Sequence, residues 1–194
     1  VRARYKREFL DIALHRYARY NRRHYSPDGR GYIEEVLSSD AEKIRLYGQP
    51  TGRISEFLTS HRHFLGYQDG DTFLDVGCGR GQNLKVLSDA FPKARLHGID
   101  MNAAAVEVIR LAAEEGKVSA AVGDLTDQQT FCGIADRAFD HVIMSHVFSL
   151  ILSDGLTATQ DTRAMIVGEM IRIARKTVMI IDGPAIMAMA PAFE

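Results

Sequence analysis

A glycine-rich turn that follows an apolar run is the part of this sequence best suited to chemistry. Residues 75–81 read Asp-Val-Gly-Cys-Gly-Arg-Gly, and a segment with helical periodicity comes next. Glycines let the backbone approach a ligand closely, and free N–H groups at the start of a helix favour an anionic group. The pattern therefore predicts a ligand-binding turn.

The spacing of these glycines disfavours a nicotinamide or flavin dinucleotide. That fingerprint is Gly-x-Gly-x-x-Gly, and its third glycine would stand where this chain has Gln82. Asp75 precedes the turn, where a carboxylate would repel a pyrophosphate. An amine on the ligand would explain Asp75 better.

Acidic residues also end the next two expected strands. Asp100 follows the run 95–99, and Asp124 follows the run 118–122. A carboxylate such as Asp100 can accept hydrogen bonds from both hydroxyls of a ribose, and Asp124 is placed to accept one from an exocyclic amine. Together the three acids fit a ligand with an ammonium group, a ribose and an adenine but no phosphates.

The elements that must position these residues alternate between strand and helix. The sequence predicts strands over 72–76, 95–99, 118–122, 139–144 and 177–181, and helices over 82–90, 103–115, 127–135 and 162–174. Strands separated by helix-length segments form βαβ crossovers, hence an α/β fold with a doubly wound, mostly parallel sheet. Ligands of such sheets bind beyond the carboxyl ends of the strands, where the turn and the acids fall.

This combination resembles the class I S-adenosylmethionine-dependent methyltransferase family over residues 72–182. The resemblance implies a Rossmann-like methyltransferase fold, methyl transfer, and S-adenosylmethionine as the cofactor, with S-adenosylhomocysteine as product. It also implies single roles. By the resemblance, the residues around the methionine moiety of the cofactor are Asp75, Gly77, Cys78, Gly79 and Gly81. Asp100 would bind the ribose, Met101 would lie against the adenine, and Asp124 with the backbone of Leu125 would bind the adenine edge.

The fourth expected strand is followed by a segment similar to the one that lies beside the transferred methyl group in the family. Ser145 is counted with the cofactor-binding residues, although its hydroxyl could equally bind backbone. His146 is the candidate catalytic residue, as a base or substrate contact, and the alternative is a histidine that lines the site or packs in the core. Many relatives carry a histidine where this chain has Leu150, so no role of that histidine is transferred. We expect His141, within the strand, to be structural.

Motifs that mark particular methyl acceptors are missing from the sequence, which reduces the number of acceptor classes to consider. The fourth strand is followed neither by the Asn/Asp-Pro-Pro-Tyr segment of enzymes that methylate nucleobase amines nor by the cysteine of cytosine C5 enzymes. No clustered Asp/Asn set suggests the magnesium-dependent type, so no metal is expected. An oxygen, nitrogen or carbon of a small molecule or saccharide remains. The alternatives are an RNA methyltransferase and a non-catalytic partner subunit that binds S-adenosylmethionine.

The first 25 residues differ in charge from the rest. They hold eight Arg or Lys and two acidic residues, whereas the whole chain has a net charge of −1. Aromatic residues recur there at helical spacing, which predicts a basic amphipathic helix. It could be a lid over the cofactor, an RNA-binding element or an oligomer contact, with Tyr17, Tyr20 and Tyr25 as hypothetical substrate-side residues. We therefore divide the chain into an N-terminal helical lid or extension, 1–68, and a methyltransferase core, 69–194.

The composition of the chain argues against several other classes of protein. No apolar run approaches the ~18 residues of a membrane span. The two cysteines, Cys78 and Cys132, have no metal-ligand spacing, so we expect buried thiols and a cytoplasmic setting. The 12 residues after Asp182 are too few for the antiparallel hairpin that completes the family's sheet. We therefore expect the C-terminal strands to be missing, with an open edge that would invite a homodimer.

Overall fold

The computed structural model describes residues 40–48, 57–58, 60–63 and 65–182. The basic helix expected over residues 1–25, with Tyr17, Tyr20 and Tyr25, lies outside these ranges, as does the tail from residue 183. The division at residue 68 stays a prediction.

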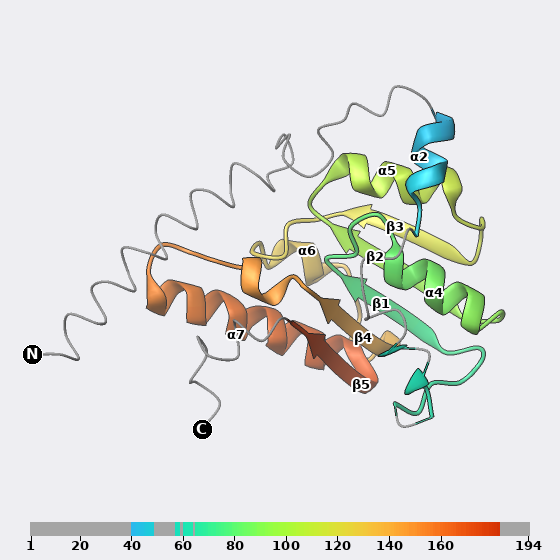
Figure 1. Ribbon diagram of the computed structural model, residues 1–194. Coiled ribbons are helices and arrows are strands. Elements are labelled where there is room, and N and C mark those ends of the chain that lie inside the picture. The colour runs from blue at the N-terminus through green and yellow to red at the C-terminus, as the bar shows by residue number, and fades with distance from the viewer. Residues whose placement is uncertain (1–39, 49–56, 59, 64, 183–194) are drawn as a thin grey trace, which may run out of the picture.

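Five parallel strands form one sheet in the order β3-β2-β1-β4-β5 (Figure 1). The chain starts in the middle, moves outward to β3, and returns to place β4 on the other side of β1, so a switch point lies between β1 and β4. The expected doubly wound α/β fold is confirmed. The strands are β1 (Thr72–Val76), β2 (Arg95–Asp100), β3 (Val118–Val122), β4 (Phe139–Ser145) and β5 (Ala174–Ile181).

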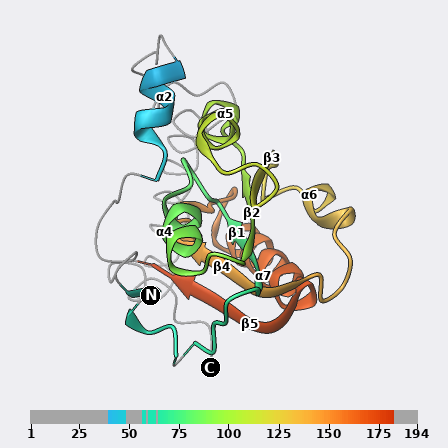
Figure 2. The ribbon, with the colours of Figure 1, turned by 90° about the vertical axis from the view of Figure 1, so that its right-hand side faces the viewer.

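Helices cover both faces of the sheet, as Figure 2 shows with α4 on one side and α7 on the other. On one face Phe73 of β1 packs in a cluster with Leu84 and with Ile109, whereas its neighbour Leu74 joins Ile166 and Met170 on the other face. This division follows from the alternation of side chains along a strand, and both faces being covered explains why β1 reads as a nearly continuous apolar run. The first face carries α2 (Asp40–Leu46), α4 (Gln82–Ala90) and α5 (Ala103–Ala112), and the second carries α6 (Gln129–Cys132) and α7 (Leu156–Ile173).

Some boundaries differ from the sequence prediction. Helix α7 begins at Leu156, well before the expected residue 162, and β5 begins at Ala174 rather than 177. Buried Thr159 explains the early start, because its hydroxyl accepts a hydrogen bond from the N–H of Ser153 and so holds the first turn. Helix α6 is shorter than expected because it ends at Gly133. Helix α5 likewise ends at Ala112, short of 115.

Cys78 is buried as expected, but Cys132 is exposed, so the expectation for Cys132 is wrong. Its helix α6 is a short surface helix in which only Phe131 is buried. None of the helices within the described ranges is long and apolar enough to cross a bilayer.

Candidate functional site

The glycine turn after β1 lies against the end of β2 and the segment after β4. The N–H groups of Gly77 and Cys78 both donate to the carbonyl of Ile99, at 2.7 and 3.0 Å. Gly77 has φ of 80°, and a Cβ there would collide with the side chain of Val147. Glycine is therefore required at this position, and it lets the chain after β4 pack directly on the turn.

Asp100 joins the turn to β2 through its carboxylate. Its Oδ2 accepts a hydrogen bond from the N–H of Gly79 at 2.8 Å, and its Oδ1 accepts one from the N–H of Asn102 at 2.9 Å. Burial raises the pKa of Asp100, although both hydrogen bonds act to lower it. Each oxygen keeps a further lone pair, so the carboxylate can still accept from hydroxyl groups of a ligand.

Asp75 is a buried carboxyl group beneath the turn, with 1% of its surface exposed. The Nδ2 atom of Asn83, in the first turn of α4, lies 3.2 Å from each of its oxygens. Burial raises the pKa of Asp75 to about 7, the Asn83 hydrogen bond lowers it, and the charge of Asp100 raises it. A ligand cation would favour the ionised form, whereas a phosphate would oppose it, so the group fits an amine-bearing ligand.

Cys78 and Gly81 serve the turn through the backbone. The Cys78 side chain is buried, and its sulfur occupies the space where a Cβ of Gly98 would stand. Burial raises the pKa of this thiol well above its ordinary value, which disfavours the thiolate form that a nucleophile needs. Gly81, with φ of 81°, is the N-cap residue of α4.

The remaining candidates from the β2 and β3 ends lie further along the same edge. Met101 is half-buried between β2 and α5. Asp124 follows β3, and its Oδ1 accepts hydrogen bonds from the N–H and the hydroxyl of Thr126 at 2.9 and 2.8 Å. The Leu125 side chain is buried in the core, which leaves its backbone for any ligand. Because β2 separates β3 from β1, these residues suit the far end of an extended ligand.

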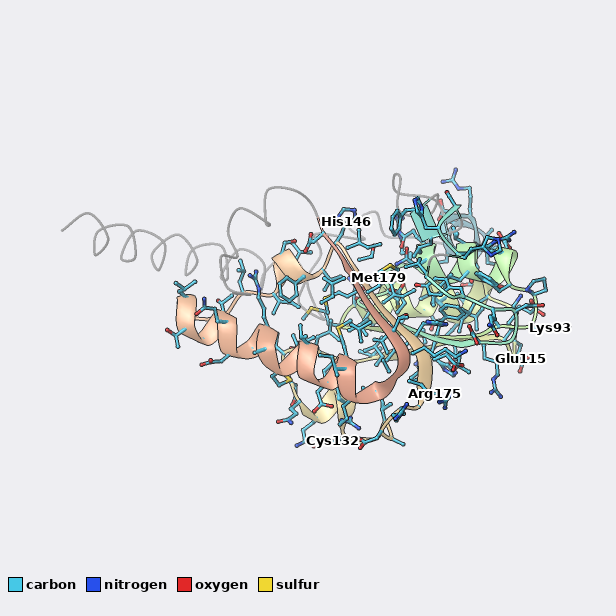
Figure 3. The ribbon with its side chains drawn as sticks, turned by 90° about the horizontal axis from the view of Figure 1, so that it is seen from below. Lys93, Glu115, Cys132, His146, Arg175 and Met179 are labelled. Atoms are coloured by element: carbon cyan, nitrogen blue, oxygen red, sulfur yellow. The ribbon has the colours of Figure 1, made fainter. Side chains whose placement is uncertain are left out.

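The β4 end presents His146 to solvent. Ser145 is the last residue of the strand, and His146 follows in the left-handed region with φ of 57°, which is strained for a residue with a side chain. Its N–H donates to the carbonyl of Ile181 at 2.8 Å, which fixes the turn. In Figure 3 His146 lies at the opposite end of the sheet from Arg175, and its side chain is exposed, so the core alternative is wrong.

Asp182 lies beside this histidine. Its Oδ1 is 4.0 Å from Nδ1 of His146, and its Oδ2 accepts a hydrogen bond from the N–H of Ser149 at 2.7 Å. The acid that follows β5 thus holds the segment after β4. The rule that found Asp100 and Asp124 at strand ends could have found Asp182, whereas nothing local in the sequence marks Asn83 or Val147.

His141 has the structural role expected of it. It is buried in β4, where Nε2 lies 2.8 Å from an oxygen of Asp71 and Nδ1 lies 2.8 Å from the hydroxyl of Thr177. Asp71 directly precedes β1 and Thr177 lies within β5 beside His141, so this contact is away from the glycine turn that follows β1. Within the described ranges, no group of three or more Asp, Glu, His or Cys side chains could hold a metal ion.

Comparison with known proteins gives a consistent picture. A family model described as "Methyltransferase domain" matches residues 73–177. The chain is 29% identical over 146 residues to an uncharacterized 37.1 kDa protein in transposon TN4556 from Streptomyces fradiae, a match that covers 70% of this chain and 39% of that protein. It is 28% identical over 116 residues to malonyl-[acyl-carrier protein] O-methyltransferase from Priestia megaterium, covering 60% of this chain and 40% of the enzyme. The chain therefore spans well under half the length of these relatives.

Among solved structures, the fold is similar to the plantazolicin methyltransferase in complex with a monoazolic desmethyl analogue and S-adenosylhomocysteine. The TM-score is 0.58 at 16% identity, over 90% of this chain and 61% of that one. At this identity the similarity concerns the fold.

Proposed function

Because this chain belongs to the class I S-adenosylmethionine-dependent methyltransferase family, with S-adenosylmethionine as its cofactor, we propose that it transfers a methyl group to an oxygen, nitrogen or carbon atom of a small molecule or saccharide. The cofactor would supply a methyl group on a sulfonium, and its transfer to an electron pair of the acceptor atom would leave a neutral thioether. The chain's own task is to hold donor and acceptor in line. Such positioning can supply roughly 7 to 11 kcal/mol.

The observation that carries the methyl-transfer part of the proposal is the Asp100 carboxylate bonded to the N–H of Gly79, beside the buried Asp75. In the proposed arrangement Asp100 accepts from the ribose hydroxyls, and Asp75 faces the ammonium group. Met101, Asp124 and the Leu125 backbone border the adenine. Gly77, Cys78, Gly79 and Gly81 approach the methionine part through the backbone.

On the acceptor side we assign His146 as the base or substrate contact. It is the exposed, left-handed residue after β4, and Gly77 brings the neighbouring Val147 onto the glycine turn. With Nδ1 towards Asp182, the imidazole can take a proton from an acceptor at Nε2. Ser145, one residue earlier, borders the methyl group from the same strand end.

The experiment measures S-adenosylhomocysteine formed from S-adenosylmethionine with small hydroxy and carboxy compounds, saccharides and a short RNA, each at low and high salt. The relative from Priestia megaterium is named as an O-methyltransferase, so oxygen acceptors are tried first. We expect turnover with a small acceptor that salt does not abolish. The His146→Ala variant should lose turnover by about 10²-fold or more while keeping its affinity for S-adenosylhomocysteine.

His63→Ala, which replaces another exposed histidine, is the matched control and should behave as wild type. Turnover with RNA alone, lost at high salt, would overturn the small-molecule assignment. Tight S-adenosylhomocysteine binding without turnover on any acceptor would favour the non-catalytic subunit.

A further inference from the structure

The two residues that follow helix α2, Tyr47 and Gly48, pack against the glycine turn from a part of the chain well before it. The side chain of Tyr47 is half-buried, and one of its ring carbons lies 2.8 Å from the position that a Cβ on Gly81 would take. Any residue with a side chain at Gly81 would therefore displace the tyrosine ring. The glycine at this position serves the contact with α2 as well as the positive φ of the turn.

Gly48, the second residue after α2, makes the reciprocal contact. Gly48 donates its N–H to the carbonyl of Arg80 at 3.3 Å, within the turn. A Cβ on Gly48, whose φ is 62°, would collide with the side-chain stem of Lys85 in α4. Each element thus carries a glycine at the point where it receives a side chain of the other, which is an interlocking contact.

The turn is consequently held from two sides. The carbonyl of Ile99 and the carboxylate of Asp100 accept its N–H groups at Gly77, Cys78 and Gly79, whereas Tyr47 and Gly48 contact it at Arg80 and Gly81. Because consecutive residues of one turn make both sets of contacts, undocking α2 frees the half of the turn that leads into α4.

We propose that Tyr47 and Gly48 are positioning residues for S-adenosylmethionine, and that docking of α2 and cofactor binding stabilise each other. The inference rests on the placement of the cofactor at the glycine turn under the proposed function. By linkage, a cofactor that requires the ordered turn must strengthen α2 docking by the same factor by which docking strengthens binding.

The test measures the Kd of S-adenosylhomocysteine by calorimetry, well below the melting temperature, for Tyr47→Leu, Tyr47→Phe and Gly48→Ala. We expect Tyr47→Leu and Gly48→Ala to raise Kd about 5- to 20-fold, and Tyr47→Phe, which keeps the ring, to bind as wild type. Tyr67→Leu is the matched control. Tyr67 belongs to the same face of the core but packs on Phe73 and Phe91, so this variant should lower Tm and leave Kd unchanged.

Hydrogen exchange supplies a readout that ordinary core packing would not move. S-adenosylhomocysteine should slow exchange in residues 40–48 of the wild type more than in α7, on the other face of the sheet. Equal protection of both segments, or equal losses of affinity in Tyr47→Leu and Tyr67→Leu, would overturn the inference. So would unchanged binding in Tyr47→Leu.

The Asp100→Asn variant distinguishes a failure of the α2 inference from a failure of the cofactor placement. If Asp100→Asn weakens binding and Tyr47→Leu does not, the cofactor placement stands and the α2 inference fails. If Asp100→Asn binds as wild type, the placement itself fails, and the α2 inference falls with it.

Discussion

Gly79 donates its backbone N–H to the Asp100 carboxylate at 2.8 Å, which ties the turn after β1 to the end of β2. The same carboxylate holds the N–H of Asn102 at the start of α5. One side chain therefore fixes two backbone segments, and each of its oxygens keeps a lone pair that can accept from a ligand at the edge where ligands of such sheets bind.

Replacing this carboxylate tests its double role. We expect Asp100→Asn to raise the Kd of S-adenosylhomocysteine about 10- to 100-fold, because hydrogen bonds to a charged group contribute about 1.5 to 3 kcal/mol each. Calorimetric titration measures the change. Glu115→Gln, an exposed acid at the other end of the sheet, is the control that should bind normally.

The buried Asp75 predicts a pH dependence of cofactor binding. Its pKa is raised to about 7, chiefly by burial, so it is protonated in much of the free protein below neutral pH. A ligand ammonium requires the ionised form, so the affinity for S-adenosylhomocysteine should rise as pH increases through about 7. Asp75→Asn should weaken binding and flatten this profile, and a wild-type slope that persists in the variant would contradict the assignment.

The raised pKa of Asp75 has the opposite effect on the stability of the ligand-free protein, which falls as pH rises. A group whose folded pKa lies above its unfolded value binds its proton more tightly in the folded state, so its contribution to stability is lost as pH rises towards 7. Urea unfolding of the ligand-free chain should therefore show Asp75→Asn losing less stability than wild type between about pH 4 and 7.

From the environment of Asp140, near the amino ends of the strands, we expect the stability of the protein to fall at acidic pH. Burial alone would raise its pKa, but hydrogen bonds from the N–H and hydroxyl of Thr72 and from Arg175, with the charge of Lys176, lower it to about 2. For a lowered pKa, the stabilisation is present above the unfolded value near 4 and is lost as pH falls towards 2. Between about pH 4 and 2, the urea concentration at the unfolding midpoint should fall in the wild type and should fall less in Asp140→Asn. Asp161→Asn, at an exposed acid of α7, should follow wild type.

The left-handed conformation of His146 should lower the stability of the protein, although we assign this residue a role in activity. A residue with a side chain in the left-handed region costs roughly 1 to 2 kcal/mol, which glycine avoids. We expect His146→Gly to raise the free energy of unfolding by about 1 kcal/mol in urea titration and yet to lose turnover. A variant that is more stable and fully active would show that the strained histidine has no part in the reaction.

The local sequence determined the sheet and its binding edge. Continuous apolar runs between helix-length segments predict parallel strands, and right-handed crossovers place their carboxyl ends together, so the glycine turn, Asp100, Asp124 and His146 had to share one edge. These rules depend on residues close in the chain and on backbone chirality, both of which are visible in one sequence. These rules did not predict the early start of α7, because Thr159 accepts a hydrogen bond from Ser153, a residue outside the helical period.

Only the tertiary structure decided how the residues at that edge meet. Asn83 on Asp75, Val147 over Gly77, Asp182 beside His146 and Tyr47 on Gly81 are contacts between segments that the chain brings together by folding. No periodicity encodes them, since each depends on the shapes of two packed surfaces and on a backbone angle at one residue. Packing also decided that His146, the residue after β4, faces solvent, whereas the structural role of His141 was predictable from its position within the strand.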